Sequence, residues 1–298
     1  MEDELWPRLY ELVRREAARK PRRRRVAFGD GLILLVLLWA ALHERPTCWA
    51  CQPRHWPAAW RPLTLPSAST VSRRARTLSL RTLLAATLDA LSAAVPRALC
   101  RTIDTKPLTV GGFSKDRDAR RGYAAGAIAR GYKLCCVWGP GAVPDTWRLA
   151  PLNRHDAQAA AEQVEELSRG PCAGGYLLAD ALHDDGRLHC RCRLAGFQLL
   201  APRVKPGRGL RHAKASDPCN DPGRLRSLEL TEGPGRFGRE LYATRKSIER
   251  RFGNLCSFGG GLSPLPAWVR RPRRVSLWVA AKLAINGVRI CALKRLNA

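Results

Sequence analysis

Short apolar runs alternate with one long helical pattern between Leu99 and Pro202, and this alternation limits the possible folds more than any other feature. The apolar runs are typical of strands and lie at 99–112, 131–139, 146–152, 174–180 and 196–202. The helical pattern is rich in helix formers, ends in glycine and covers 155–170. Strands interrupted by such a helix predict an α/β domain with flanking helices.

The residues before this domain, 1–97, have the pattern of an all-helical region. Apolar side chains at helical spacing predict helices at 3–18, 30–43 and 80–97. A further short helix is expected where Ser67 or Ser69 serves as the N-cap. The first third of the chain therefore differs in structural class from the α/β domain.

The short helix near Ser67 carries Arg73, Arg74 and Arg76, which we expect to be exposed. A capped helix with exposed arginines is typical of the recognition helix of a helix-turn-helix DNA-binding motif. An amphipathic packing helix with a charged outer face explains the same residues equally well. Arg73 and Arg74 are therefore candidate DNA contacts, and both interpretations stay open.

The chain is strongly basic, with 52 Lys and Arg residues against 25 Asp and Glu residues in 298, a formal charge of +27. Such an excess repels itself unless a polyanion lies nearby, so nucleic acid is the leading partner. An anionic membrane is the alternative, but the longest apolar run, 31–42, is too short to span a bilayer. We therefore expect DNA and no membrane. A Gly-, Pro- and Arg-rich stretch at about 203–239 predicts a mobile basic loop.

The cysteines and the first residues indicate the compartment. Eleven cysteines are an odd number, and the acidic start, MEDELW, lacks the basic beginning of a secretory signal. Reduced thiols in a cytosol are therefore expected.

Two aspartates stand at predicted strands. Asp104 lies within or at the end of the strand at 99–112, and Asp180 ends the strand at 174–180. Sites in open α/β sheets form at strand ends. Both carboxylates are therefore candidates for a functional site.

A third carboxylate, Glu249, is the last acidic residue of the chain and stands in a strongly basic helical pattern. Tyr242, Arg245 and Glu249 are three and four positions apart in turn, so they share one face of the predicted helix. A separate apolar stripe that can dock on a sheet consists of Leu241, Ile248, Phe252 and Leu255. The simpler interpretation is an ordinary surface ion pair between Arg245 and Glu249, worth only about 0.3–0.5 kcal/mol.

Together the three carboxylates favour a metal site. Asp104 and Asp180 on adjacent strands, with Glu249 from a docked helix, can hold two divalent ions about 3.5–4 Å apart. Such ions activate a nucleophile and stabilise the leaving oxygen in phosphodiester chemistry. Hard oxygen ligands suit Mg²⁺ or Mn²⁺. The neighbouring arginines would then bind the phosphates of the nucleic acid.

Other acidic residues compete for the metal role. Asp116 and Asp118 stand in a charged segment, SKDRDARRG, and are expected to serve solubility. Asp184 and Asp185 come soon after the second strand-end aspartate and are expected at a helix start. The first three carboxylates are therefore the preferred set.

The order and spacing of these motifs resemble those of the DDE transposases of bacterial insertion sequences, which have an RNase H-like catalytic core. The similar segments are IDTKPL around Asp104, GYKL on the next strand, LNRHDAQAA before the central helix, YLLAD ending at Asp180 and YATRKSIERRFGNL around Glu249. The aspartates are 180 − 104 = 76 residues apart, and the glutamate lies 249 − 180 = 69 residues further on. The helical front and the tail beginning GLSPLPAWVRRP also resemble this family, so the similarity covers almost the whole chain.

The resemblance implies two domains. A helical DNA-binding and dimerisation region would cover 1–97, and an RNase H-like catalytic domain with a mixed sheet would cover 98–298. The implied activity is that of a transposase that binds the terminal inverted repeats of its element in double-stranded DNA. It would nick the DNA ends with two Mg²⁺ or Mn²⁺ ions and transfer the 3′-hydroxyl ends to target DNA. The implied assembly is a homodimer on paired ends in the bacterial cytoplasm, at the nucleoid.

The resemblance also implies roles for single residues. Asp104, Asp180 and Glu249 would bind the metal ions and carry the catalysis. Tyr242 and Arg245 would hold a phosphate or the flipped end of a strand. The expected DNA contacts, including those of the short N-terminal helix, are Tyr242, Arg245, Lys106, Arg250, Arg73 and Arg74.

The chain departs from the family pattern at two positions. The family's glutamate motif runs Tyr, two residues, Arg, three residues, Glu, six residues, Lys, and Cys256 stands at the last place. The family often has Tyr three residues after the second aspartate, where this chain has His183, expected as a packed or exposed histidine rather than a phosphate contact. Cys256 keeps open an inactive, decayed or domesticated DNA-binding protein. A simple metal-dependent nuclease on the same fold is a further alternative.

Overall fold

The computed structural model describes residues 2–20, 26–92, 99–124, 126–170, 174–203, 221–257, 262 and 264–296. Contacts divide the chain into two compact units. The helical unit comprises Met1–Ala94 and Asn254–Ala298, and the sheet unit comprises Val95–Gly253. The expected catalytic domain covered all of 98–298, whereas the C-terminal segment from Asn254 groups with the N-terminal helices.

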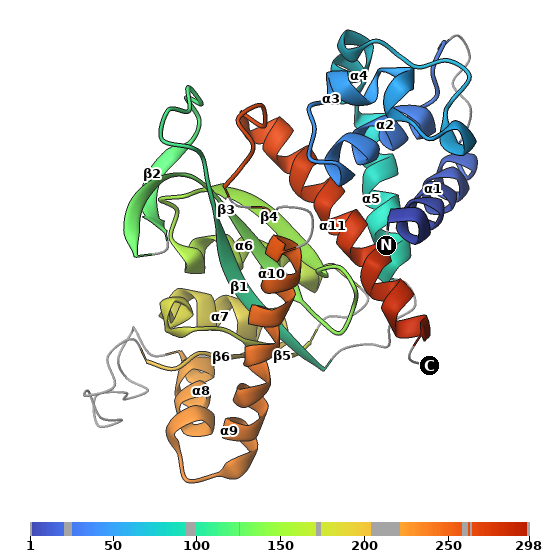
Figure 1. Ribbon diagram of the computed structural model, residues 1–298. Helices are drawn as coiled ribbons and strands as arrows, with labels where there is room; N and C mark the ends of the chain where they lie inside the picture. The colour runs from blue at the N-terminus through green and yellow to red at the C-terminus, as the bar shows by residue number, and fades with distance from the viewer. Residues whose placement is uncertain are drawn as a thin grey trace. The chain divides into compact units, whose positions relative to one another are not determined.

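The helical unit is built around one long C-terminal helix (Figure 1). Its α-helices are α1 (Glu2–Ala18), α2 (Asp30–Leu42), α3 (Thr47–Ala50), α4 (Ala68–Arg74), α5 (Leu78–Ser92) and α11 (Pro272–Leu296). The expected cap of α4 is confirmed, because the Ser67 hydroxyl accepts a hydrogen bond from the Thr70 amide. Helix α11 packs on α1, α2 and α5. The expected helical front region is therefore present.

The helical unit is held together by a cluster of tryptophan rings and by the packing of the long apolar helix α11. The rings of Trp6, Trp39 and Trp56 pack together in its core, with Trp39 and Trp56 stacked at 4.9 Å between centroids. Within the described residues, Pro272–Leu293 is long and apolar enough, by length and composition, to cross a membrane. However, 67% of its most apolar stretch is buried inside the structure. Its contacts with α1, α2 and α5 account for its apolar surface.

The sheet unit contains one six-stranded mixed sheet (Figure 1). Its strands are β1 (Cys100–Thr109), β2 (Arg120–Ala124), β3 (Ala127–Trp138), β4 (Thr146–Pro151), β5 (Gly175–Leu178) and β6 (Phe197–Leu200). The order is β2-β3-β1-β5-β6, with β4 also paired to β3. Strands β1 to β4 pair antiparallel, whereas β5 is parallel to both β1 and β6. The predicted fold class is therefore confirmed.

The helices of the sheet unit differ from the prediction in one region. They are α6 (Asp156–Ser168), α7 (Gly186–Leu194), α8 (Pro222–Glu232), α9 (Arg236–Ala243) and the first part of α10 (Ser247–Ser257), whose residues from Asn254 onward group with the helical unit. The expectation of a loop throughout 203–239 is wrong, because α8 and the start of α9 lie there. Helix α8 packs on β6, where the Ser227 hydroxyl accepts a hydrogen bond from the buried Ala201 amide at 3.0 Å. The parts of this loop and of the 80–97 helix at 204–220 and 93–97 lie outside the described residues.

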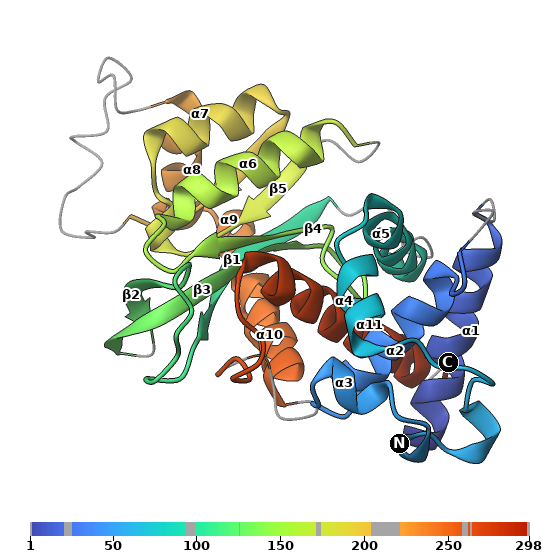
Figure 2. The same ribbon diagram turned by 90° about the horizontal axis from the view of Figure 1, so that it is seen from above.

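The two faces of the sheet are covered by different helices (Figure 2). Ile103 of β1 and Val137 of β3 belong to a buried cluster with apolar side chains of α6 and α7. On the other face, the Phe252 ring of α10 meets Trp138 of β3 edge to face at 5.9 Å. Successive side chains of a strand alternate between faces, so the neighbours of Ile103 point toward the α10 side.

Candidate active site

Asp104 and Asp180 lie side by side because their strands are parallel neighbours. Residue Thr102 of β1 pairs with Leu178 of β5. Each aspartate stands two positions later, so the two lie at the same level, Asp104 within β1 and Asp180 just beyond the end of β5. Asp104 is next to Ile103 in the strand and therefore lies on the opposite face, which carries α10. This confirms that the two predicted strand-end carboxylates meet.

The segment that carries the third carboxylate is helical with one tightened turn. Tyr242 lies near the end of α9, Arg245 lies in the 3₁₀ turn Thr244–Lys246, and Glu249 lies in the first turn of α10. The backbone stays in the right-handed helical region across this turn, with φ −60° at the following Ser247. The helix predicted to carry Tyr242, Arg245 and Glu249 is therefore present, but as two α-helices joined by a 3₁₀ turn.

Two contacts dock this helical segment on the sheet. The Tyr242 hydroxyl donates a hydrogen bond of 3.0 Å to the carbonyl of Ala179, the residue before Asp180. The Arg251 guanidinium lies 5.6 Å from the Trp138 ring centroid and donates to the Gly141 carbonyl at 2.8 Å. Burial raises the pKa of Tyr242, so its hydroxyl remains a proton donor at neutral pH. The segment is thus held against the strand that ends in the second aspartate.

Arg245 links all three predicted carboxylates. Its Nη2 atom lies 3.4 Å from Oδ2 of Asp104 and 4.0 Å from Oδ2 of Asp180. Its Nη1 atom lies 4.0 Å from Oε1 of Glu249. The side chains of Arg245 and Asp104 are each 16% exposed, whereas that of Glu249 is 71% exposed. The surface ion pair expected between Arg245 and Glu249 is therefore one arm of a larger cluster.

The electrostatic environment separates the two aspartates. Burial raises the pKa of Asp104, and the nearby Asp180 charge adds to this, while the Thr105 amide and Arg245 act in the opposite direction. Burial also disfavours the Asp180 charge, but hydrogen bonding and charge from His183, with Arg245, outweigh it and lower its pKa. Asp104 is therefore the carboxyl group of the pair that takes up a proton more readily, and Asp180 is the one that keeps its charge.

His183 has a structural role in the site that the sequence analysis missed. The ring is fully buried, and its Nδ1 atom lies 2.7 Å from Oδ1 of Asp180. The same Asp180 oxygen accepts from the Leu182 amide at 3.0 Å, which caps the 3₁₀ turn Ala181–His183. The expectation of a packed histidine holds, and the i, i+3 spacing in a capped turn was the available signal. His183 orients the Asp180 carboxylate.

The predicted DNA contacts fall into three groups. Lys106 is half-buried on β1, two positions beyond the first aspartate and on the same face. Arg250 on α10 and Arg73 on α4 are exposed. The expected exposure of Arg74 is wrong, because its guanidinium donates to Asp30 at 2.5 Å and to the Phe28 carbonyl at 2.8 Å. Arg74 joins α4 to the start of α2.

Three of the four competing acids, Asp116, Asp184 and Asp185, have partners other than Arg245. Asp116 is buried and accepts a hydrogen bond of 2.9 Å from the Tyr132 hydroxyl, so the expected role in solubility is wrong. Asp185 caps α7, as predicted, by accepting from the Leu188 amide. Asp184 is ion-paired with Arg224 at 2.7 Å. These contacts leave the first three carboxylates as the open acidic set.

The three carboxylates have the donor chemistry for a divalent ion. Among the described residues, no three His, Cys, Asp or Glu side chains are close enough to form a ready metal cluster. The guanidinium of Arg245 supplies the central positive charge instead. Carboxylate oxygens are hard ligands that suit Mg²⁺ or Mn²⁺, and here they converge on one cation. The ligand chemistry of the three carboxylates suits a divalent ion, whereas in this arrangement they surround the guanidinium of Arg245.

Comparison with known proteins identifies a family. The sequence model of the family described as "Transposase DDE domain" matches residues 96–281, a range that contains all three carboxylates. Among solved structures, the chain is similar to the piggyBac transposase in a cryo-EM structure of its synaptic complex with hairpin DNA, with 12% identity and a TM-score of 0.44. That similarity covers 95% of this chain and 71% of the other chain. No curated protein matches the chain.

Proposed function

Because the chain belongs to the transposase DDE domain family, we propose that it cuts and joins DNA at the site formed by Asp104, Asp180 and Glu249. Members of this family generally use divalent metal ions. In the proposal the ions are two Mg²⁺ or Mn²⁺ ions. The DNA is double-stranded, and comprises the terminal inverted repeats of an insertion sequence and the target into which they are joined.

One observation carries the proposal: Arg245 contacts carboxylates from three distant segments of the chain. Charges collected in this way are costly to hold together unless they serve a cation. A structural ion pair would need only one of the three acids. The exposed position of Glu249 and the half-buried position of Asp180 leave the cluster accessible to a substrate.

The chemistry is a pair of phosphodiester exchanges. A water oxygen attacks the phosphorus at the element end, the bond to the 3′ oxygen breaks, and a 3′-hydroxyl and a 5′-phosphate result. The 3′-hydroxyl then attacks a target phosphodiester, and the target's own 3′ oxygen leaves. When bound, the divalent ions supply activation of the attacking oxygen and stabilisation of the leaving oxygen.

The chain's own residues hold the ions and the DNA. Asp104 and Asp180 provide fixed oxygens, and His183 keeps the second of these oriented. Arg245 becomes available for a phosphate oxygen when its carboxylates take a metal ion, since Arg binds phosphates in a fork. The exposed Arg250 extends the phosphate-binding surface along α10. We place two subunits on paired DNA ends, in the bacterial cytoplasm at the nucleoid.

A strand-transfer assay tests the proposal. The substrate is a labelled DNA end taken from the sequence flanking the coding region, with supercoiled target and Mg²⁺ or Mn²⁺. Wild type is compared with Asp180→Ala and Glu249→Ala. Glu240→Ala is the matched control, because Glu240 is an exposed glutamate on α9 that pairs with Arg236, four positions away on the same helix.

The expected result is joined product with wild type and Glu240→Ala, and none with the two site variants. Salt-sensitive DNA binding without nicking in either metal would indicate an inactive DNA-binding protein instead. Cys256→Lys would then test whether the missing lysine accounts for the lost activity. Cleavage without joining, and without preference for the flanking ends, would indicate a simple nuclease.

A further inference from the structure

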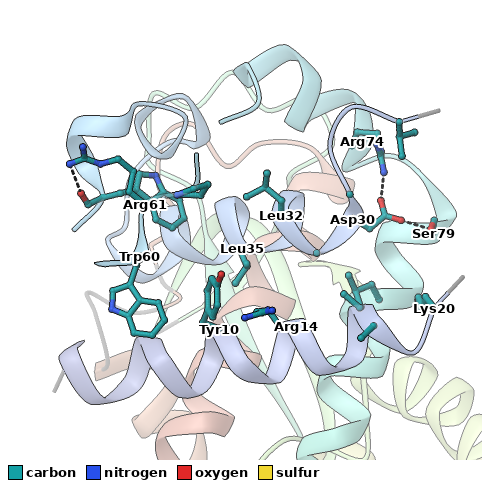
Figure 3. Close-up of a pocket in the computed structure, with 18 of the residues that line it drawn as sticks. Tyr10, Arg14, Lys20, Asp30, Leu32, Leu35, Trp60, Arg61, Arg74 and Ser79 are labelled. Atoms are coloured by element: carbon teal, nitrogen blue, oxygen red, sulfur yellow. Dashed lines mark hydrogen bonds and ion pairs between the residues drawn. The ribbon is translucent and has the colours of Figure 1, made fainter. Parts of the chain in front are cut away.

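The helical unit contains a pocket that no part of the proposed chemistry uses. It has a volume of about 640 Å³ and lies between α1, α2 and the segment 56–62 (Figure 3). None of its lining residues belongs to the carboxylate site. Its volume falls in the range of about 300–1,000 Å³ that is typical of small-ligand sites. We refer to it as the α1–α2 pocket.

One wall of the α1–α2 pocket is aromatic and apolar. Tyr10 projects from α1 beside Trp60, with the two ring centroids 5.1 Å apart (Figure 3). Leu32 and Leu35 of α2 face them across the pocket (Figure 3). Both aromatic rings are only half-buried, so ring surface remains available to a ligand. Such a wall suits a flat unsaturated ring, which can stack on an aromatic face.

The pocket also presents positive charge. Arg14 is exposed, and its guanidinium lies 5.8 Å from the Tyr10 ring centroid. Lys20 is half-buried and also lines the pocket (Figure 3). Neither side chain forms an ion pair in the part of the chain that the structure describes. Burial lowers the pKa of Lys20 although the charge of Asp30 raises it, so a bound anion would stabilise the ammonium.

The acidic group in the pocket, Asp30, is hydrogen-bonded to other side chains, although its charge also acts on Lys20. Asp30 accepts hydrogen bonds from Arg74 at 2.5 Å and from the Ser79 hydroxyl at 2.5 Å. Its carboxylate is therefore hydrogen-bonded to one side chain of α4 and one of α5. Arg14 lies beside Tyr10 on α1, whereas Lys20 lies at the other end of the pocket, near Asp30 and Ser79 (Figure 3).

From these observations we propose that the α1–α2 pocket binds a single unpaired nucleotide, with its base against Tyr10 and Trp60 and its phosphate at Arg14 and Lys20. An unpaired nucleotide is favoured over paired DNA because the bases of a duplex are covered on both faces by their stacked neighbours and cannot stack on Tyr10 and Trp60. An acidic peptide would satisfy the cations but would leave the aromatic wall unused. The site goes beyond the proposed function and shares with it only the class of partner.

Anisotropy measurements with labelled DNA test the pocket. The probes are a short blunt duplex and the same duplex with a few unpaired thymidines, and free dTMP and poly-glutamate serve as competitors. EDTA is present throughout, so that no chemistry occurs. The variants are Tyr10→Leu, which keeps apolar packing without a flat ring, and Arg14→Ala. Arg8→Ala is the matched control, because Arg8 is exposed on α1 and does not line the pocket.

The expected result is tighter binding of the overhang duplex than of the blunt duplex. Tyr10→Leu and Arg14→Ala should each weaken overhang binding about tenfold, the loss expected for one base–aromatic stack or one charged contact. Blunt-duplex binding should change no more than in Arg8→Ala. Displacement of the overhang by dTMP at low concentration would identify a free nucleotide as the ligand, and no displacement would identify a strand end.

Two outcomes would overturn the pocket proposal. Equal affinity for both duplexes with no dTMP binding is one, provided that thermal unfolding shows all proteins folded. The second such outcome is that poly-glutamate competes with the DNA, and that Tyr10→Leu and Arg14→Ala abolish this competition. Strand transfer that fails while the overhang preference persists would count against the proposed function alone. A lost preference with intact strand transfer would count against the pocket alone.

Discussion

Replacement of Arg245 by methionine is the most informative single change, because it removes the charge at the centre of the site and keeps the length of the side chain. Arg245 Nη2 lies 3.4 Å from Asp104 and 4.0 Å from Asp180. The carboxylates are 16% and 32% exposed. Without the guanidinium, two partly buried negative charges face each other with less compensation.

The size of the effect is set by these distances. An opposite charge nearby lowers a carboxyl pKa by about 1–3 units, and each unit corresponds to about 1.4 kcal/mol. Both distances are long for an ion pair, so the low end applies to each carboxylate. Arg245→Met should therefore lower the free energy of unfolding by about 1–3 kcal/mol at neutral pH. For a domain of this size the melting temperature should fall by about 2–4 °C per kcal/mol.

The loss should depend on pH with a definite sign. The pKa of Asp180 is lowered in the folded protein, so its stabilising contribution is present above the unfolded value and lost as the pH falls through the folded value. The pKa of Asp104 is raised, so its contribution becomes unfavourable as the pH rises through that value. Arg245→Met raises both folded pKa values, which destabilises at neutral pH and has little effect in acid.

Thermal unfolding monitored by circular dichroism between about pH 3 and pH 8, without divalent ions, measures this dependence. Arg250→Met is the control, since Arg250 is an exposed neighbour on α10. Added Mn²⁺ should raise the melting temperature more in Arg245→Met than in wild type, because the competing cation is gone. A loss that is equal at all pH values, or equal to that of the control, would refute the reasoning.

Three further predictions concern contacts around the site and in the helical unit. Tyr242→Phe removes a hydroxyl that donates to a backbone carbonyl, and should cost about 0.5–1.5 kcal/mol in thermal unfolding and reduce DNA joining; no change in either would contradict the docking role. Burial disfavours the Asp184 charge, but hydrogen bonds from Arg224 and a histidine lower its pKa to about 2, so its stabilising contribution is present above the unfolded value and lost as pH falls through about 2. Arg224→Met should cost about 2 kcal/mol at about pH 7 and progressively less in acid, and an NMR titration in which the Asp184 pKa stays at about 2 would show the account to be wrong. Glu44→Gln removes the carboxylate 2.6 Å from the Lys282 ammonium, whose pKa burial lowers although Glu44 raises it. The buried ammonium loses its proton as the pH rises through that lowered pKa. The variant's free energy of unfolding should therefore fall by about 1–3 kcal/mol at about pH 7 and by less at about pH 10. Equal decreases at both pH values would argue against the ion pair.

The sequence alone predicted the elements that depend on local pattern. The strands around Asp104 and Asp180, the helix after His155 and the capped helix after Ser67 all form close to where periodicity and capping place them. Hydrophobic period and cap chemistry are properties of a few neighbouring residues, so they can be read without the fold. Asp180 was identifiable in the same way, because it directly follows a short apolar strand.

Elements that depend on a partner were missed. Strand β2 has no apolar alternation, and it exists because it pairs with β3. Helix α8 lies in a Gly- and Pro-rich stretch and is held by its packing on β6, where Ser227 bonds to Ala201. The buried Asp116 and the bonded Arg74 had the composition of surface residues. Asp116 is hydrogen-bonded to Tyr132 and Arg74 to Asp30, and neither partner is a near neighbour in the sequence.

The sequence therefore determined the class of fold, the order of its strands along the chain and the identity of three acidic residues with a shared chemistry. Only the tertiary structure decided that Arg245 contacts all three, that His183 orients Asp180 and that Tyr10 and Arg14 line a pocket. The reason is physical. Local pattern determines which face of an element is apolar, whereas the distance between side chains far apart in the sequence depends on how the elements pack, as the Tyr242 contact to Ala179 across 63 positions shows.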